Sequence, residues 1–143
     1  MTDDYEKYEQ ACQAIRNDNA PLLEAFAGWL RAKGLSETTV RKHRDNVDFY
    51  VNECLLYEEA TSAAVGVYEV GWFLGYWFIR KAMWASPWSI RSNAASLKKF
   101  YHSIIKFFLF DKLSSNQNSG VSRYNSRSCI ARSFFILPAG PLS

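Results

Sequence analysis

The stretch "GLSETTVRKHRDNVDFY", residues 34–50, decides the fold class of this chain. It opens with Gly34, which ends a preceding helix because glycine adopts the left-handed cap conformation without a Cβ penalty. Ser36 then caps a new helix, in which apolar or aromatic residues recur every three or four positions. The spacing predicts a helix whose buried seam holds Val40, His43, Val47, Tyr50 and Cys54.

The other side of this helix carries a different set of residues. Because successive helical residues turn by about 100°, the side opposite the seam holds Thr38, Arg41, Lys42, Asp45 and Phe49. The seam is therefore interpreted as structural, and the back of the helix as free to bind a partner.

The same spacing extends toward the N-terminus. An apolar stripe predicts a first helix from about Asp4 to Arg16, and Asp18 or Asn19 is expected to cap a second helix that ends at Gly34. Pro21 then falls in the first turn, where its missing N–H has no helical partner in any case.

Toward the C-terminus the pattern predicts two more helices. A dense aromatic helix is expected from about Val67 to Met83, and Ser86 is expected to cap a last helix that has Pro87 in its first turn. Nothing in residues 1–112 alternates as a strand does. The prediction is an all-α fold: a four-helix bundle at residues 19–112, preceded by an extra N-terminal helix at residues 1–18.

The character of the sequence changes over residues 113–143. This segment is rich in Ser and Asn and, after residue 113, carries no acidic residue and no sustained helical period. Such a composition predicts a disordered tail. The abrupt change also suggests a hypothesis that the tail is an out-of-frame readthrough product, which an adjacent coding frame continuing the domain better would support.

Charge is distributed unevenly along the 143 residues. Residues 1–69 carry thirteen of the fourteen acidic residues, whereas residues 70–110 carry six basic residues and no acidic one. A basic half on an otherwise acidic domain is typical of a protein that binds a polyanion. The acidic N-terminus and the short apolar runs indicate a cytoplasmic protein that does not contact a membrane.

Catalytic and cofactor-binding motifs are not evident. Cys12, Cys54 and Cys129 lack any metal-ligand spacing, and His43 and His102 fall on different predicted helices without a nucleophile nearby. The sequence therefore favours a protein that is not an enzyme and that uses no metal or other cofactor. The aromatic set Trp72, Trp77, Trp84 and Trp88 suggests base stacking, but helical spacing favours packing in the core.

Residues 34–50 resemble the signature of the N-terminal, core-binding domain of tyrosine recombinases, the phage integrases, which has a SAM-like fold. The matching positions are Gly34, Leu35, Ser36, Thr39, Val40, Val47 and Tyr50, whereas His43 replaces the usual tyrosine. The segments "LLEAFAGWLRAKG" and "WSIRSNAASLKKFYHSI" also resemble helices of that domain. The resemblance covers about residues 19–110.

The resemblance implies a helical bundle that forms half of a clamp around double-stranded DNA, in DNA recombination and integration. Carried over by position, the DNA contacts are Ser36, Thr39, Lys42, Arg91, Ser92 and Lys99. The catalytic domain of the family has no counterpart after residue 110, so strand cleavage is not expected from this chain. A separate catalytic chain or a second copy of this chain would be a further partner. Ala95 replaces a frequent serine, and the acidic Glu37, Asp45 and Asp48 predict weak, salt-sensitive binding.

Two alternatives stay open at the level of sequence. In one, the aromatic helix docks a protein partner or a second copy, and in the other the chain is a non-functional recombinase relic. An exposed apolar patch would favour the protein partner, whereas a basic stripe over Lys42, Arg91 and Lys99 would favour DNA. Failure to form a compact fold would favour the relic. The sequence specifies neither a target site nor an oligomeric state.

Overall fold

A computed structural model describes residues 2–115 of the chain, with side chains described for residues 3–107. Within residues 2–115 the chain forms helices and connecting turns and no β-strand, which confirms the predicted all-α fold. The prediction of a disordered tail lies outside the described residues apart from the last turn of α5. The elements are α1 (Thr2–Ala32), α2 (Glu37–Phe49), η1 (Tyr50–Cys54), η2 (Val65–Tyr68), α3 (Val70–Trp72), η3 (Phe73–Trp77), α4 (Phe78–Lys81) and α5 (Pro87–Ser115).

The predicted break between the first two helices is corrected by the structure, because α1 runs uninterrupted through Pro21. Pro21 has no N–H to give to the carbonyl of Asn17, but both residues are exposed, so water can pair with that carbonyl. Asn19 does not cap a helix either. Its side chain is 1% exposed, and its Nδ2 donates to the Val51 carbonyl at 3.3 Å and to Asn52 Oδ1 at 2.8 Å. A tertiary contact therefore replaces the expected local cap.

The turn into α2 and the seam of α2 follow the prediction. Gly34 has φ +86°, and Ser36 caps the helix. Val40, Val47 and Tyr50 are each no more than 1% exposed. After Phe49 the helix widens into the π-helical segment η1, in which the Leu55 N–H donates to the Tyr50 carbonyl at 3.0 Å.

The expected exposure of Phe49 is wrong. Its ring is half-buried and lies within 5.4–6.3 Å of four other aromatic rings, measured between centroids. These rings belong to Phe73, Trp77, Phe78 and Trp84. The side of α2 opposite its seam is thus covered at its C-terminal end and open only toward its N-terminal end.

The predicted aromatic helix over residues 67–83 is present as shorter pieces. The 3₁₀ turn η2 comes first, and α3, the π-helical η3 and α4 then form one continuous helical run to Lys81. Phe73, Trp77 and Phe78 of this run are buried in the core.

The last helix, α5, begins where the sequence predicts. The Ser89 N–H donates to Ser86 Oγ at 3.1 Å, so Ser86 caps the helix and Pro87 occupies its first turn. Leu97, Tyr101 and Ile104, spaced by four and three, are buried on one side of α5. The same side also buries polar residues that the apolar spacing did not predict, namely Ser89, Asn93, Ser96 and Ser103.

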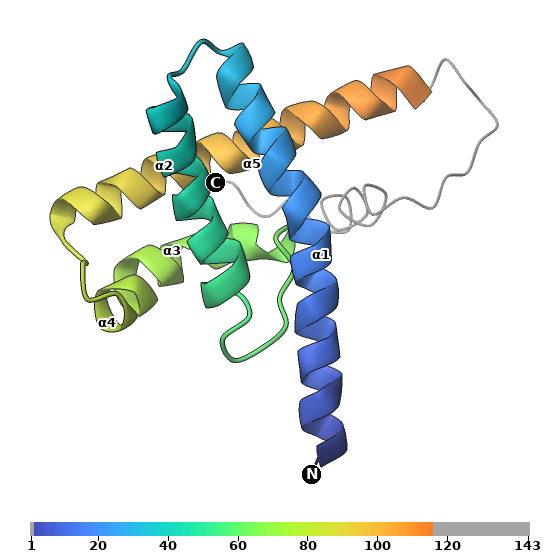
Figure 1. The fold of residues 1–143 in the computed structure, drawn as a ribbon, viewed down its shortest axis with the longest axis vertical. Coiled ribbons are helices and arrows are strands. Elements are labelled where there is room, and N and C mark those ends of the chain that lie inside the picture. The colour runs from blue at the N-terminus through green and yellow to red at the C-terminus, as the bar shows by residue number, and fades with distance from the viewer. Residues whose placement is uncertain (1, 116–143) are drawn as a thin grey trace, which may run out of the picture.

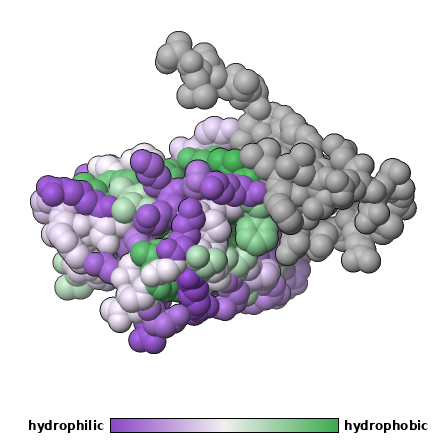
Figure 2. Space-filling view, turned by 90° about the horizontal axis from the view of Figure 1, so that it is seen from above, coloured by the Kyte–Doolittle hydropathy of each residue, from purple (hydrophilic) through white to green (hydrophobic). Residues whose placement is uncertain are grey.

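The helices pack around one core between α1, α2, α5 and the 65–81 segment (Figure 1). Two tyrosines link the core to the segment before α3: the Tyr50 hydroxyl donates to the Gly66 carbonyl in η2, and the Tyr101 hydroxyl donates to the Ala63 carbonyl at 2.6 Å. Burial raises the pKa of both hydroxyls, so both stay protonated donors. The two cysteines in the described part of the chain, Cys12 and Cys54, are buried, and Cys54 is so in the predicted seam. Figure 2, seen from above, shows a mainly hydrophilic face with smaller hydrophobic patches.

Candidate nucleic-acid interface

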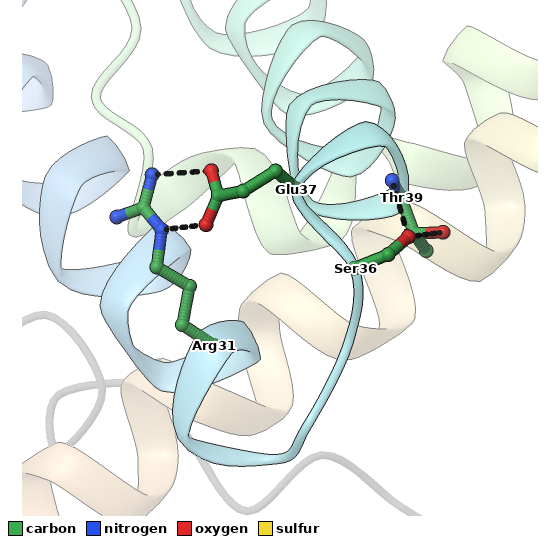
Figure 3. A network of polar contacts seen from close by, with 4 residues as sticks. All are labelled: Arg31, Ser36, Glu37 and Thr39. Carbon is green, nitrogen blue, oxygen red and sulfur yellow. Dashed lines mark hydrogen bonds and ion pairs between the residues drawn. The ribbon is translucent and has the colours of Figure 1, made fainter.

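The start of α2 presents two hydroxyl groups side by side. Ser36 has extended backbone angles, φ −67° and ψ 155°, and its Oγ accepts the Thr39 N–H at 3.3 Å. The Oγ of Ser36 and the Oγ1 of Thr39 are 3.0 Å apart (Figure 3). Because the serine oxygen satisfies one of the unpaired N–H groups of the first turn, both hydroxyls are held at the helix start.

The acidic residue next to this pair is turned away from it. Glu37 accepts two hydrogen bonds from Arg31 of α1, with Nε to Oε1 at 2.7 Å and Nη2 to Oε2 at 3.2 Å. Figure 3 shows the Arg31–Glu37 ion pair on the other side of the chain from Ser36 and Thr39. The hydrogen bonds from Arg31 hold the pKa of the Glu37 carboxyl below its usual value. The negative charge of Glu37 is therefore paired with Arg31 and does not face the two hydroxyls.

A polar cluster joins α2 to α5 where the two helices pack together. His43 Nδ1 lies 2.7 Å from Ser96 Oγ, and Asn46 Nδ2 donates to Ser92 Oγ at 3.2 Å and to Ser96 Oγ at 3.0 Å. Ser96 Oγ in turn donates to the Ser92 carbonyl at 3.0 Å. Since that hydroxyl proton is used, we assign the Nδ1–H tautomer to His43, with Nδ1 donating to Ser96.

The surroundings of His43 keep it neutral. Burial lowers its pKa first, and the nearby charges of Lys99 and Lys42 lower it further. The structural role predicted for His43 is consistent with this cluster, but its surroundings are polar rather than the expected apolar seam. The two lysines that affect the His43 charge therefore come from different helices, α2 and α5.

Lys42 is held by an aromatic ring rather than by a carboxylate. Its Nζ lies 3.8 Å from the centroid of the Trp88 ring, and Trp88 is 64% exposed at the first turn of α5. No carboxylate among the described side chains lies within 4.0 Å of the charged groups of Lys42, Arg91 or Lys99. Their charges are consequently available to an external anion.

The structure brings together most of the six residues predicted to contact DNA, in two groups. Ser36 and Thr39 form the pair at the start of α2, Ser92 belongs to the polar cluster through Asn46, and Lys42 and Lys99 both lower the pKa of His43 in that cluster. Arg91 is exposed on α5, but no described hydrogen bond, ion pair or ring contact joins it to the other five. Ser92 is half-buried and already accepts from Asn46.

Trp88 is the residue at this interface that reasoning from sequence misplaced. The prediction of core packing is correct for Trp77, which is 6% exposed. It is wrong for Trp72, Trp84 and Trp88, which are 43%, 60% and 64% exposed. The signal was available, because Trp88, Ser92 and Lys99 are spaced by four and seven and so share one side of α5. Lys42 of α2 stacks on Trp88 and therefore meets this side of α5.

Other chemistry finds little support in residues 3–107. No group of three or more His, Cys, Asp or Glu side chains there is arranged to hold a metal ion. None of the helices in the described region is long and apolar enough to cross a membrane. No protein-family model matches the chain, and no curated protein or solved structure matches it either.

Proposed function

We propose that the helical bundle binds double-stranded DNA along the side shared by the N-terminal half of α2 and the first half of α5, without cutting the DNA. The observation that carries this proposal is that Lys42 and Lys99 are exposed on two helices that pack together, α2 and α5, and have no described carboxylate partner. Lysines placed in this way neutralise phosphates and release counterions.

The neighbouring acidic residues are largely engaged elsewhere. Glu37 is paired with Arg31, and Asp48 accepts a hydrogen bond from Asn52. Asp45 is exposed on the same helix, three residues after Lys42, and has no described ion-pair partner. Weak binding that depends strongly on salt is therefore the expected behaviour.

The hydroxyls of Ser36 and Thr39 would add hydrogen bonds to phosphate oxygens at the start of α2. Such contacts position a protein on DNA and carry little base information. In the manner of the tyrosine-recombinase domain that the sequence resembles, the bundle would serve site-specific recombination or integration, with cleavage supplied by a separate catalytic chain.

The test is fluorescence anisotropy with a labelled random duplex, at low salt and at physiological salt. The variant K42A/R91A/K99A should bind more weakly, and the slope of log affinity against log salt should fall by about 0.9 for each phosphate that the variant no longer neutralises. Its helix content by circular dichroism should equal that of the unchanged protein.

A matched control separates the site from general charge. K42A/K99A and K7A/R16A each remove two positive charges, but Lys7 and Arg16 lie on α1. We expect a large loss of affinity only for K42A/K99A. Equal losses of affinity for both variants, or no binding at low salt by a folded sample, would refute the proposal, and a chain that does not fold would favour the relic interpretation.

A further inference from the structure

The helical run α3–η3–α4 presents an aromatic stack to solvent. The rings of Trp72 and Tyr76 stack with centroids 6.2 Å apart and planes 29° apart, and the Arg80 guanidinium lies 4.8 Å from the Tyr76 centroid. The two rings are 43% and 49% exposed, and Ile79 and Met83 nearby in sequence are 53% and 100% exposed. We call Trp72, Tyr76 and Arg80 the aromatic stack.

The composition of this surface indicates a protein partner of acidic character. Aromatic residues, Met and Arg are enriched where proteins bind one another. Arg80 and Lys81 add two positive charges; no described carboxylate pairs with either, and Lys81 Nζ donates to the Tyr57 hydroxyl at 3.0 Å. A partner that brings both an apolar group and carboxylates would complement this surface, whereas a second aromatic stack would meet like charge.

The chain itself carries such a segment at the start of α1. Residues 3–9 contain four carboxylates, at Asp3, Asp4, Glu6 and Glu9, against one base, Lys7. Tyr5 adds an aromatic ring that is 64% exposed. We call residues 3–9 the acidic end.

The acidic end projects from the bundle. Figure 1 shows the N-terminal turns of α1 extending beyond the other helices. The Tyr8 hydroxyl, which donates to the Leu56 carbonyl, and Cys12 Sγ, 4.0 Å from the same oxygen, mark where α1 meets the body. Tyr8 thus anchors the acidic end to the body, whereas residues 3–7 and Glu9 are exposed.

We propose that the acidic end of one copy docks on the aromatic stack of a second copy. The carboxylates would face Arg80 and Lys81, and Tyr5 would pack against the exposed rings of Trp72 and Tyr76. If both copies exchange this contact, the dimer is closed and two-fold. None of the six residues proposed to contact DNA belongs to either surface, so the inference stands independently of DNA binding.

Charge reversal tests the proposal, with sedimentation velocity of the full chain over a wide range of concentrations as the readout. The unchanged chain should form a dimer that high salt weakens. D4K/E6K/E9K should be monomeric because its basic N-terminal end would repel Arg80 and Lys81 of the second copy. R80E/K81E should be monomeric because its acidic stack would repel the carboxylates of the second copy. Circular dichroism checks that both variants are folded.

Mixing the two variants makes the test specific. In the mixture each contact again joins opposite charges, so a dimer containing one chain of each variant should form. R16E/K33E, a double charge reversal outside the acidic end with Arg16 on α1 and Lys33 in the turn after it, should dimerise like the unchanged chain. A monomeric unchanged chain, a dimer that survives either reversal, or a mixture of folded variants that stays monomeric would each overturn the proposal.

Discussion

Lys42 of α2 lies with its Nζ 3.8 Å from the ring centroid of Trp88, which belongs to the first turn of α5. The contact fixes a long, flexible side chain without neutralising its charge, because an aromatic ring attracts a cation but carries no net charge. A carboxylate in the same place would hold Lys42 equally well but would compete with a phosphate. Trp88 is therefore interpreted as an orienting residue for the proposed DNA contact.

Replacing Trp88 should separate orientation from charge. We expect Trp88→Ala to weaken duplex binding by about 2- to 5-fold, the equivalent of an exposed cation–π contact of about 0.5–1 kcal/mol. The salt dependence should stay unchanged, because Lys42 still reaches the phosphate. Anisotropy titrations at several salt concentrations measure both quantities.

Trp72→Ala is the matched control for that substitution, since Trp72 is also exposed but lies on α3. It should leave duplex affinity unaltered. If Trp88→Ala lowered the salt slope as much as Lys42→Ala does, or left affinity unaltered, the orienting role would be wrong.

His43 should make folding stability depend on pH. Burial and the two neighbouring lysines lower its pKa in the folded state below the ordinary value of 6.5, so between these two values the unfolded chain binds more protons. This part of the free energy of unfolding is therefore fully present above pH 6.5 and is lost as the pH falls through the folded-state pKa. Urea unfolding at pH values on both sides of 6.5 measures the change.

His43→Gln should remove this dependence, because glutamine does not titrate. His102→Gln, which replaces the exposed histidine on α5, should keep it. An identical pH profile for His43→Gln and the unchanged protein would assign the dependence to another group.

Asn19 is expected to stabilise the fold through a carbonyl far along the chain. Asn19→Ala removes the buried donor to the Val51 carbonyl, and leaving a buried acceptor unpaired costs about 1–3 kcal/mol of unfolding free energy. Asn17→Ala, at an exposed position two residues away, should change it by less than about 0.5 kcal/mol. Urea titrations compare the two, and equal effects would contradict the role given to Asn19.

The sequence alone determined the features that depend on neighbouring residues. Gly34 ends a helix and Ser36 begins the next because a left-handed turn and a capped N–H are local requirements. The buried seam of Val40, Val47 and Tyr50 follows from the helical period, which fixes the side of a helix on which each residue lies. These rules were sufficient for the all-α class and for much of the core.

Tertiary structure decided what lies opposite each of those sides. Asn19 stays within a continuous helix because Val51 and Asn52, over thirty residues away, accept its hydrogen bonds. Phe49 is covered because the 65–81 segment and Trp84 pack over it, and His43 meets Ser96 because α5 packs against α2. The helical period determines the side of a helix on which each residue lies, but it does not determine which distant segment packs against that side. The neighbours of Lys42 could therefore be known only from the packed fold.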